Sequence, residues 1–413
     1  MKKTTFFFVC ILTLILSINW IRDRREKIDI DDSSDDFIQF YNQNTGWFSS
    51  SVNRDTIFKT SNGGLNWVGY LTVDTNRLST LFFIDQNTGW AVGRRGKIVK
   101  TTTGGTSWFL QTSGVQSWLN DVKFIDAQTG FIVGSYDSSR VILKTTTGGV
   151  SWLSISSNGA GRLFSVKMLS ANIIYAAGDS GRILFTSNGG SSWNTQSTNV
   201  NTTLREIVMR SSSSGCAVGL NGVILTTTNN GTNWVNRSFD NINFYSADFS
   251  SIDTGYIGGQ YGRIYKTTNA GVNWFQQSTP VDTTKNIKSI FCISNQIAWA
   301  SAKGDGLIYT TNGGITSITS ISTEVPSEYT LFQNYPNPFN PNTKIRFSIP
   351  KTSFSKLTIY DVTGRVMAIL VNEELNPGQY EVDWDASHRA SGVYYYKLET
   401  ESYMETKKMV LLK

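Results

Sequence analysis

The stretch TSNGGLNW, residues Thr60–Trp67, decides the fold because it returns along the chain at a nearly constant interval. Similar octets end at Trp108, Trp152, Trp193, Trp234 and Trp274, and a seventh, TTNGGITS, ends at Ser317, where the tryptophan is lost. Successive octets end 41, 44, 41, 41, 40 and 43 residues apart. Such a regular period predicts a repeat architecture in which each period is one supersecondary unit.

Each period contains four short strand patterns. The second period shows them as LSTLFFID, NTGWAVG, KIVKTT and SWFLQTS, which are rich in β-branched and aromatic residues and bounded by Gly, Asn or Asp. Four strands in about 41 residues form one propeller blade. Seven periods therefore predict an all-β, seven-bladed β-propeller over residues 37–323, and closing the ring removes exposed sheet edges.

The octets lie between the third and fourth predicted strands and resemble the Asp-box, or BNR, repeat, with Asn or Thr in place of its Asp. We expect Gly to supply positive φ, Asn or Thr to bond turn amides, and Trp to pack between blades. A Thr-Gly-aromatic marker, as in Thr45-Gly46-Trp47, precedes the second strand. Both markers are interpreted as scaffold.

The combination of Thr-Gly-Trp, Val-Gly, Lys-Thr-Thr and Gly-Gly-x-x-Trp is similar to the propellers of photosystem II assembly and stability factors. The resemblance covers residues 37–323 and implies a non-catalytic docking propeller. It does not imply photosynthesis.

The N-terminus combines a basic start with a short apolar run at residues 6–18, which predicts a secretory signal peptide over residues 1–20. An uncleaved anchor stays open. Residues 21–36 carry mixed charge and are interpreted as a spacer. Cys216 and Cys292 lie in different repeats and are interpreted as small buried side chains, with pairing left open.

Five of the seven prolines fall between Pro326 and Pro350, and alternating strand patterns follow. This predicts an Ig-like β-sandwich over residues 324–413. NYPNPFNPNTKI, LTIYDVTGRVM, SGVYYYKL and KKMVLLK resemble the type A C-terminal sorting domain of the type IX secretion system. The matching positions are Asn337, Pro338, Phe339, Asn340, Pro341, Gly364, Gly392, Lys407 and Lys408. The resemblance implies export through the periplasm, handled by the type IX machinery, to the cell surface or the medium.

Catalytic residue types are sparse in the propeller. The only histidine, His388, lies in the C-terminal module, so neither a histidine triad nor a histidine metal site is expected in the propeller. Glu206 and the aspartates Asp121, Asp137, Asp179, Asp248 and Asp305 show no marked pair. We expect no enzyme activity, metal or cofactor, but a sialidase-like glycosidase stays open.

In a propeller, the loops entering the first strand share one face with the loops between the second and third strands. On that face we expect a basic ligand-binding surface formed by Arg77, Arg94, Arg95, Arg140, Arg162, Arg182, Arg205 and Arg263, with Arg54, Trp118, Lys285 and Lys303 nearby. The planar guanidinium group of arginine binds carboxylates through two parallel hydrogen bonds. The ligand would be a protein segment or an anionic glycan, although these charges could instead pair with Asp137, Asp179 and Asp305.

A net charge of +6 without a Lys/Arg block gives no indication of nucleic-acid binding. The sequence thus predicts a monomeric, secreted or surface-bound, non-catalytic docking propeller. Two alternatives remain: an Asp-box glycoside hydrolase, and a periplasmic assembly factor of the photosystem II stability type.

Overall fold

The computed structural model describes residues 21–22, 37–49, 56–73, 76–137, 139–155, 161–277, 279–302, 306–310, 319–322, 325–386 and 389–412. The chain divides into two compact units with a boundary between residues 315 and 316. Both are built of antiparallel strands, which confirms the all-β prediction. No helix in the described residues is long and apolar enough to cross a membrane.

The first unit consists of seven four-stranded sheets. From innermost to outermost strand, blade 1 is β2 (Phe37–Phe40), β3 (Gly46–Ser49), β4 (Thr56–Thr60) and β5 (Val68–Leu71). Blades 2 and 3 are β6 (Leu78–Phe83), β7 (Gly89–Gly93), β8 (Ile98–Thr101), β9 (Phe109–Gln111), and β10 (Trp118–Phe124), β11 (Gly130–Tyr136), β12 (Ser139–Thr145), β13 (Leu153–Ser154). Blades 4 and 5 are β14 (Leu163–Met168), β15 (Ile174–Gly178), β16 (Ile183–Thr186), β17 (Asn194–Gln196), and β18 (Leu204–Met209), β19 (Gly215–Gly219), β20 (Ile224–Thr227), β21 (Val235–Asn236). Blade 6 is β22 (Phe244–Phe249), β23 (Gly255–Gly259), β24 (Ile264–Thr267) and β25 (Phe275–Gln277).

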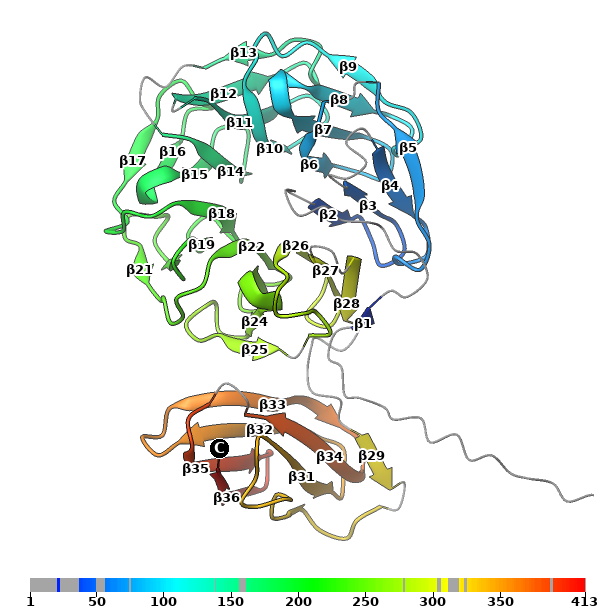
Figure 1. The fold of residues 1–413 in the computed structure, drawn as a ribbon, viewed down its shortest axis with the longest axis vertical. Coiled ribbons are helices and arrows are strands. Elements are labelled where there is room, and N and C mark those ends of the chain that lie inside the picture. Colours follow the sequence, from blue (N-terminus) through cyan, green and yellow to red (C-terminus); the bar gives the residue numbers. More distant parts are fainter. Residues whose placement is uncertain are drawn as a thin grey trace, which may run out of the picture. The chain divides into compact units, whose positions relative to one another are not determined.

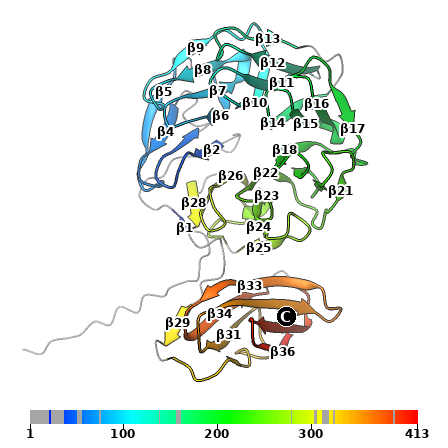
Figure 2. The same cartoon turned by 180° about the vertical axis from the view of Figure 1, so that it is seen from behind.

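The innermost strands form a closed ring. They contact one another in the order β2, β6, β10, β14, β18, β22 and β26 (Ile287–Cys292), and β26 then contacts β2 (Figure 1). The view from behind shows the same circular order (Figure 2). The seven-bladed propeller is thereby confirmed.

The octet works as a hairpin closure built from local bonds. The hydroxyl of Thr60 accepts a hydrogen bond from the Gly64 amide at 3.0 Å, and the Asn62 side chain accepts one from the Asn66 amide at 2.9 Å. Gly64 has φ +95°, which L side chains rarely adopt. The indole of Trp67 donates to the Gly64 carbonyl at 3.0 Å. These bonds confirm the expected turn chemistry.

The Thr-Gly-aromatic marker connects neighbouring blades. Trp47 of β3 stacks on Phe83 of the next blade, with ring centroids 3.6 Å apart, and donates to the Gly104 carbonyl at 2.9 Å. Trp299, in β27 (Ala298–Ala302), makes the equivalent stack on Phe40 at 3.6 Å. One repeated contact therefore also joins blade 7 to blade 1.

Blade 7 takes its outermost strand from the other end of the chain. Its sheet contains β26, β27, β28 (Gly306–Thr310) and β1 (Ile21–Arg22), with Ile21 opposite Tyr309. The interpretation of residues 21–36 as a spacer is therefore wrong for Ile21 and Arg22; the other residues of that range lie outside the described residues until β2. The reason is that the next described strand after β28 belongs to the C-terminal sheet, which leaves the edge of β28 open for β1.

The second unit is a sandwich of two four-stranded sheets. One has the order β29 (Thr319–Ser322), β34 (Gly378–Asp385), β31 (Asn342–Ile349), β30 (Thr330–Leu331); the other has β33 (Val366–Leu375), β32 (Ser353–Asp361), β35 (Gly392–Glu399), β36 (Met404–Leu411). Phe347, Ile359, Trp384 and Tyr396 lie in its buried core.

The expected domain boundary after residue 323 is placed too late. Strand β29 pairs with β34, with Thr319 opposite Glu381, so residues 319–322 belong to the C-terminal unit. The density of prolines marked the entry of the sandwich, but the backbone of β34 needs a partner at its edge, and the segment before the prolines supplies it.

Candidate functional site

The loops of the predicted basic face are tied together by backbone hydrogen bonds. In blade 2, the Arg94 amide donates to the Arg77 carbonyl at 2.9 Å, and the Gly96 amide donates to the Ser117 carbonyl at 2.6 Å, which belongs to the loop entering blade 3. The turn between the second and third strands thus contacts the entry loops of its own blade and of the next blade. The expected sharing of one face is correct.

These turns have a repeated conformation that exposes one side chain. The short 3-10 turns η1 (Arg94–Gly96), η2 (Asp179–Gly181) and η3 (Gln260–Gly262) each carry a central non-glycine residue in the left-handed region: Arg95, Ser180 and Tyr261, with φ between 56° and 62°. Arg94 and Arg95 are both exposed. Blades 2, 4 and 6 therefore present different side chains from the same backbone conformation.

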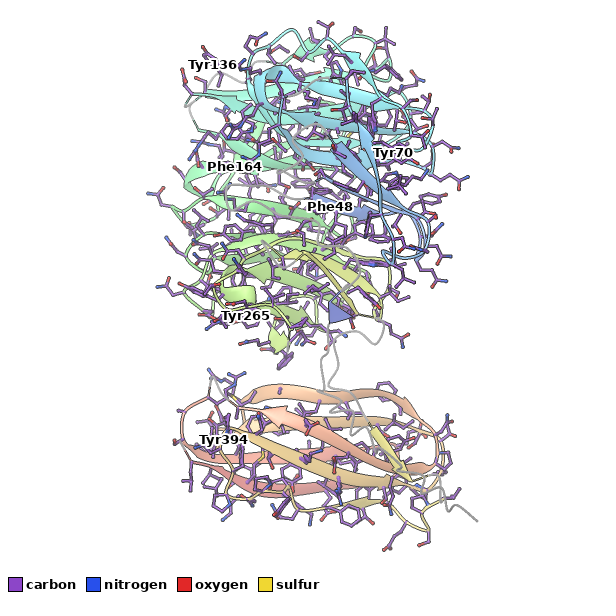
Figure 3. The ribbon with its side chains drawn as sticks, turned by 45° about the vertical axis from the view of Figure 1, so that its right-hand side comes forward. Phe48, Tyr70, Tyr136, Phe164, Tyr265 and Tyr394 are labelled. Atoms are coloured by element: carbon purple, nitrogen blue, oxygen red, sulfur yellow. The ribbon has the colours of Figure 1, made fainter. Side chains whose placement is uncertain are left out.

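The first strands of blades 2 to 7 carry a β-bulge at equivalent positions. The strand register shifts around one residue in each of them, and we call these residues the bulge ring: Ser79, Asn120, Phe164, Arg205, Tyr245 and Lys288. A bulge redirects a side chain at the end of a sheet. Phe164, labelled in Figure 3, Tyr245 and Lys288 were missed in the sequence, although their equivalent repeat position was a signal that could have revealed them.

Several cations of this face lie on aromatic rings. The Arg94 guanidinium lies 4.1 Å from the centroid of Trp118, whose indole donates to Ser79 at 3.1 Å. Arg205 lies 4.6 Å from Phe164, and Lys288 lies 4.3 Å from Tyr245. An aromatic ring fixes a cation without neutralising it. The charges of Arg94 and Arg205 are therefore positioned for an external anion.

Two other predicted arginines have carboxylate partners. Arg162 bonds Asp179 at 2.9 Å, and Arg263 bonds Asp240 at 2.6 Å. For these two, the interpretation as paired surface charges fits better than that of a ligand contact. Arg162 also lies 5.3 Å from the Phe164 ring.

Arg140 and Arg182 approach each other on this face. Burial, and then the charge of Arg182, lowers the pKa of Arg140. Arg182 also lines an open depression of about 470 Å³, together with Gly161, Asp179, Ser180, Asn201, Thr202 and Thr203. Arg54, Lys303 and Asp305 lie outside the described residues.

Charged side chains also gather on the innermost strands, and we call Asp121, Lys123, Lys167, Glu206 and Asp248 the axial cluster. Asp121 bonds Lys123 at 2.6 Å and accepts the Val166 amide at 2.9 Å. Asp248 accepts the Cys292 amide at 2.8 Å, and Glu206 accepts a bond from Ser165 at 3.0 Å. These carboxylates bond groups of neighbouring blades, and two of them satisfy amides on the inner edge.

Burial shifts the pKa values of several groups in the axial cluster. Burial, and then the Asp121 carboxylate, raises the pKa of Glu206 to about 8. Burial also raises the pKa of Asp248 and lowers that of Lys167.

No group of three or more His, Cys, Asp or Glu side chains in the described part of the chain is arranged to hold a metal ion. Cys216 and Cys292 are unpaired, buried thiols, as interpreted from the sequence.

The predicted sorting residues lie in the loop before β31, in the turn between β32 and β33, at the start of β35 and on the C-terminal strand β36. The Asn337 side chain accepts the Val410 amide at 2.9 Å, and Phe339 is buried with its ring 5.4 Å from Trp384. Lys407 bonds Glu405 at 2.9 Å. The others occupy turns or surface: Pro338, Asn340, Pro341, Gly364, Gly392 and Lys408. Their role in sorting remains a prediction.

Family comparisons agree with both resemblances. Residues 107–311 match the family described as photosynthesis system II assembly factor YCF48. Residues 333–412 match the family described as secretion system C-terminal sorting domain. The C-terminal unit thus supports export by the type IX system, and the propeller supports a binding or assembly type of function. No curated protein matches the chain.

Solved structures share the propeller fold. One described as "YCF48 bound to D1 peptide" has a TM-score of 0.58 and 16% identity, covering 71% of this chain and 95% of that chain. YCF48 from Cyanidioschyzon merolae has a TM-score of 0.57 and 15% identity, covering 71% and 98%. The WD40 repeats of RRP9 have a TM-score of 0.59 and 9% identity, covering 71% and 97%. At these identities the likeness shows the fold alone.

Proposed function

We propose that the chain is a secreted or surface-bound, monomeric docking protein whose propeller binds an acidic segment of a partner protein. Arg94 and Arg205 carry the proposal because each guanidinium lies on an aromatic ring, which holds the cation in place without a carboxylate partner among the described residues. A carboxylate-bearing chain lying across this face would meet Arg94 from blade 2 and Arg205 from blade 5.

The contacts of the carboxylates argue against the glycosidase alternative. A glycosidase needs one carboxyl group as acid and another as nucleophile or base at the scissile bond. Asp121 and Asp248 instead accept backbone amides of the next blade. A similar propeller has been solved with a peptide bound.

The first prediction concerns charge reversal at the exposed face. We expect Arg94→Glu to weaken binding of a fluorescent oligoglutamate peptide by at least about tenfold, because it replaces an attraction of one to a few kcal/mol by repulsion. Fluorescence anisotropy at low and at physiological salt measures the effect, which should shrink as salt screens the charges.

Arg237→Glu is the matched control, since Arg237 is exposed directly after β21 at the outer rim and the charge change is the same. It should bind as the wild type does, with both variants keeping the wild-type melting temperature. Equal losses in the two variants, or tighter binding of heparin than of the peptide, would contradict the proposal. Arg263 is unsuitable for reversal because a Glu there would face Asp240.

The export half of the proposal is tested separately. Deleting residues 319–413, the sandwich including β29, should leave the propeller inside the cell envelope, as measured by fractionation and immunoblotting in a host with the type IX system. Unchanged delivery to the medium or the surface would refute this half.

A further inference from the structure

The loop at residues 333–341 covers the free edge of the last strand, β36. The Gln333 side-chain amide donates to the Lys408 carbonyl at 2.9 Å. The Phe339 amide donates to the Val410 carbonyl at 3.0 Å, and the Phe339 carbonyl accepts the Leu412 amide at 3.0 Å. With the Asn337 bond to Val410, these contacts occupy an edge that would otherwise be open to other strands.

Side chains of this loop divide into two groups by burial. Asn334 and Phe339 are each only 2% exposed. The backbone amide of Asn334 donates to the Tyr396 hydroxyl at 2.8 Å. The side-chain amide of Asn334 donates to the Thr343 hydroxyl, also at 2.8 Å. These two residues fasten the loop to the sandwich.

Between these anchors the loop presents an apolar projection, which we call the knuckle: Tyr335, Pro336 and Pro338. The Tyr335 side chain is 79% exposed, and both prolines are exposed. The backbone of Tyr335 exchanges two hydrogen bonds with Lys344, each of 2.9 Å. The knuckle is thus an aromatic and proline surface held rigidly by its backbone, while its rings add little to the core.

We propose that the knuckle is the surface by which a receptor of the secretion machinery recognises the sorting domain, through an apolar pocket that takes the Tyr335 ring and the adjacent prolines. This rests on the proposed function, in which the C-terminal unit directs export. A rigid loop loses little conformational entropy on binding, and tyrosine is among the residues that dominate interface energies.

The extent of the family match supports a component of the secretion machinery as the occupant. The match to the sorting-domain family begins at residue 333, where the loop begins, and ends at residue 412, where its last bond to the terminal strand is made. Strands β29 and β30 complete one sheet but lie outside the match. The part shared with other sorting domains thus begins with the loop at residues 333–341 and ends with β36, and the structure joins these two segments. This is expected if the secretion machinery recognises both segments together.

The test compares export of full-length variants in a host with the type IX system. Tyr335→Ser and Tyr335→Gln should each lower the exported fraction at least about tenfold and accumulate in the periplasm, as expected from loss of one dominant interface side chain. Tyr335→Phe should restore most export. Phe354→Ser is the matched control, because Phe354 is a 49% exposed aromatic residue on β32, away from the loop, and it should be exported normally.

Purified variants should keep the wild-type melting temperature. Normal export of either Tyr335→Ser or Tyr335→Gln would overturn the inference. A lowered melting temperature would also overturn it, by showing that Tyr335 stabilises the fold. If deletion of residues 319–413 leaves export intact, the proposed export function fails; if that deletion blocks export while the Tyr335 variants are exported, the failure belongs to the knuckle alone.

Discussion

Replacing Trp299 with alanine is expected to lower the free energy of unfolding of the propeller by about 3–5 kcal/mol, the range for loss of a buried aromatic side chain. Trp299 is 3% exposed and stacks on Phe40 at 3.6 Å. Its indole also donates to the Gly63 carbonyl at 3.0 Å. The substitution removes a contact between blades 7 and 1, the two blades that close the ring.

Chemical denaturation monitored by circular dichroism measures this loss. Trp118→Ala serves as the control, because Trp118 is 40% exposed and its removal should cost no more than about 1 kcal/mol. If both substitutions lower the free energy of unfolding equally, the contact between Trp299 and Phe40 does not stabilise the ring more than an exposed tryptophan does. If Trp299→Ala unfolds at the same denaturant concentration as the wild type, the prediction is wrong.

Glu206→Gln is expected to flatten the dependence of propeller stability on pH. The folded-state pKa of Glu206 is about 8, whereas an unfolded glutamate titrates near ~4.3. Between these values the folded state holds a proton that the unfolded state releases, so wild-type stability falls as pH rises through this window and levels off above it. At about 1.4 kcal/mol per unit, reduced for the part of the side chain that stays accessible, the fall is on the order of 2–4 kcal/mol.

Glutamine keeps the acceptor for Ser165 without an ionisable group, so the variant should exceed the wild type in melting temperature most at pH 8 and least at pH 5. Asp121, Lys123, Lys167 and Asp248 also act on Glu206 or one another and remain in the variant. Asp126→Asn is the control. Backbone hydrogen bonds from Thr129 and Gln128 lower the pKa of Asp126, so its titration falls at acid pH and the slope between pH 5 and 8 should persist. A wild-type slope in Glu206→Gln would show that another group of the cluster carries the proton.

Local bonds explain why the blade could be predicted. Thr60, Asn62 and Gly64 bond within a single octet, and each octet closes one hairpin. The same chemistry returns with every period, so residue types at fixed spacing were sufficient for strand order and blade number. The shared face of the arginine loops followed from that order.

Contacts between repeats could not be predicted in this way. The period shows that Ser79, Phe164 and Lys288 occupy equivalent positions, but not that each of them lies in a β-bulge. It also did not distinguish Arg94, held on Trp118, from Arg263, neutralised by Asp240. These differences depend on which side chains of adjacent blades meet.

The sequence by itself determined the seven-bladed ring, the C-terminal sandwich and the resemblance to a sorting domain, because these depend on short motifs and their spacing. Only the tertiary structure decided that Ile21 and Arg22 complete blade 7, that Asp121 and Glu206 share an axial cluster, and that the loop at residues 333–341 covers the last strand. The physical reason is that ring closure and sheet edges bring together groups far apart in the chain, whose partners are selected by unsatisfied backbone bonds and by burial rather than by any local pattern.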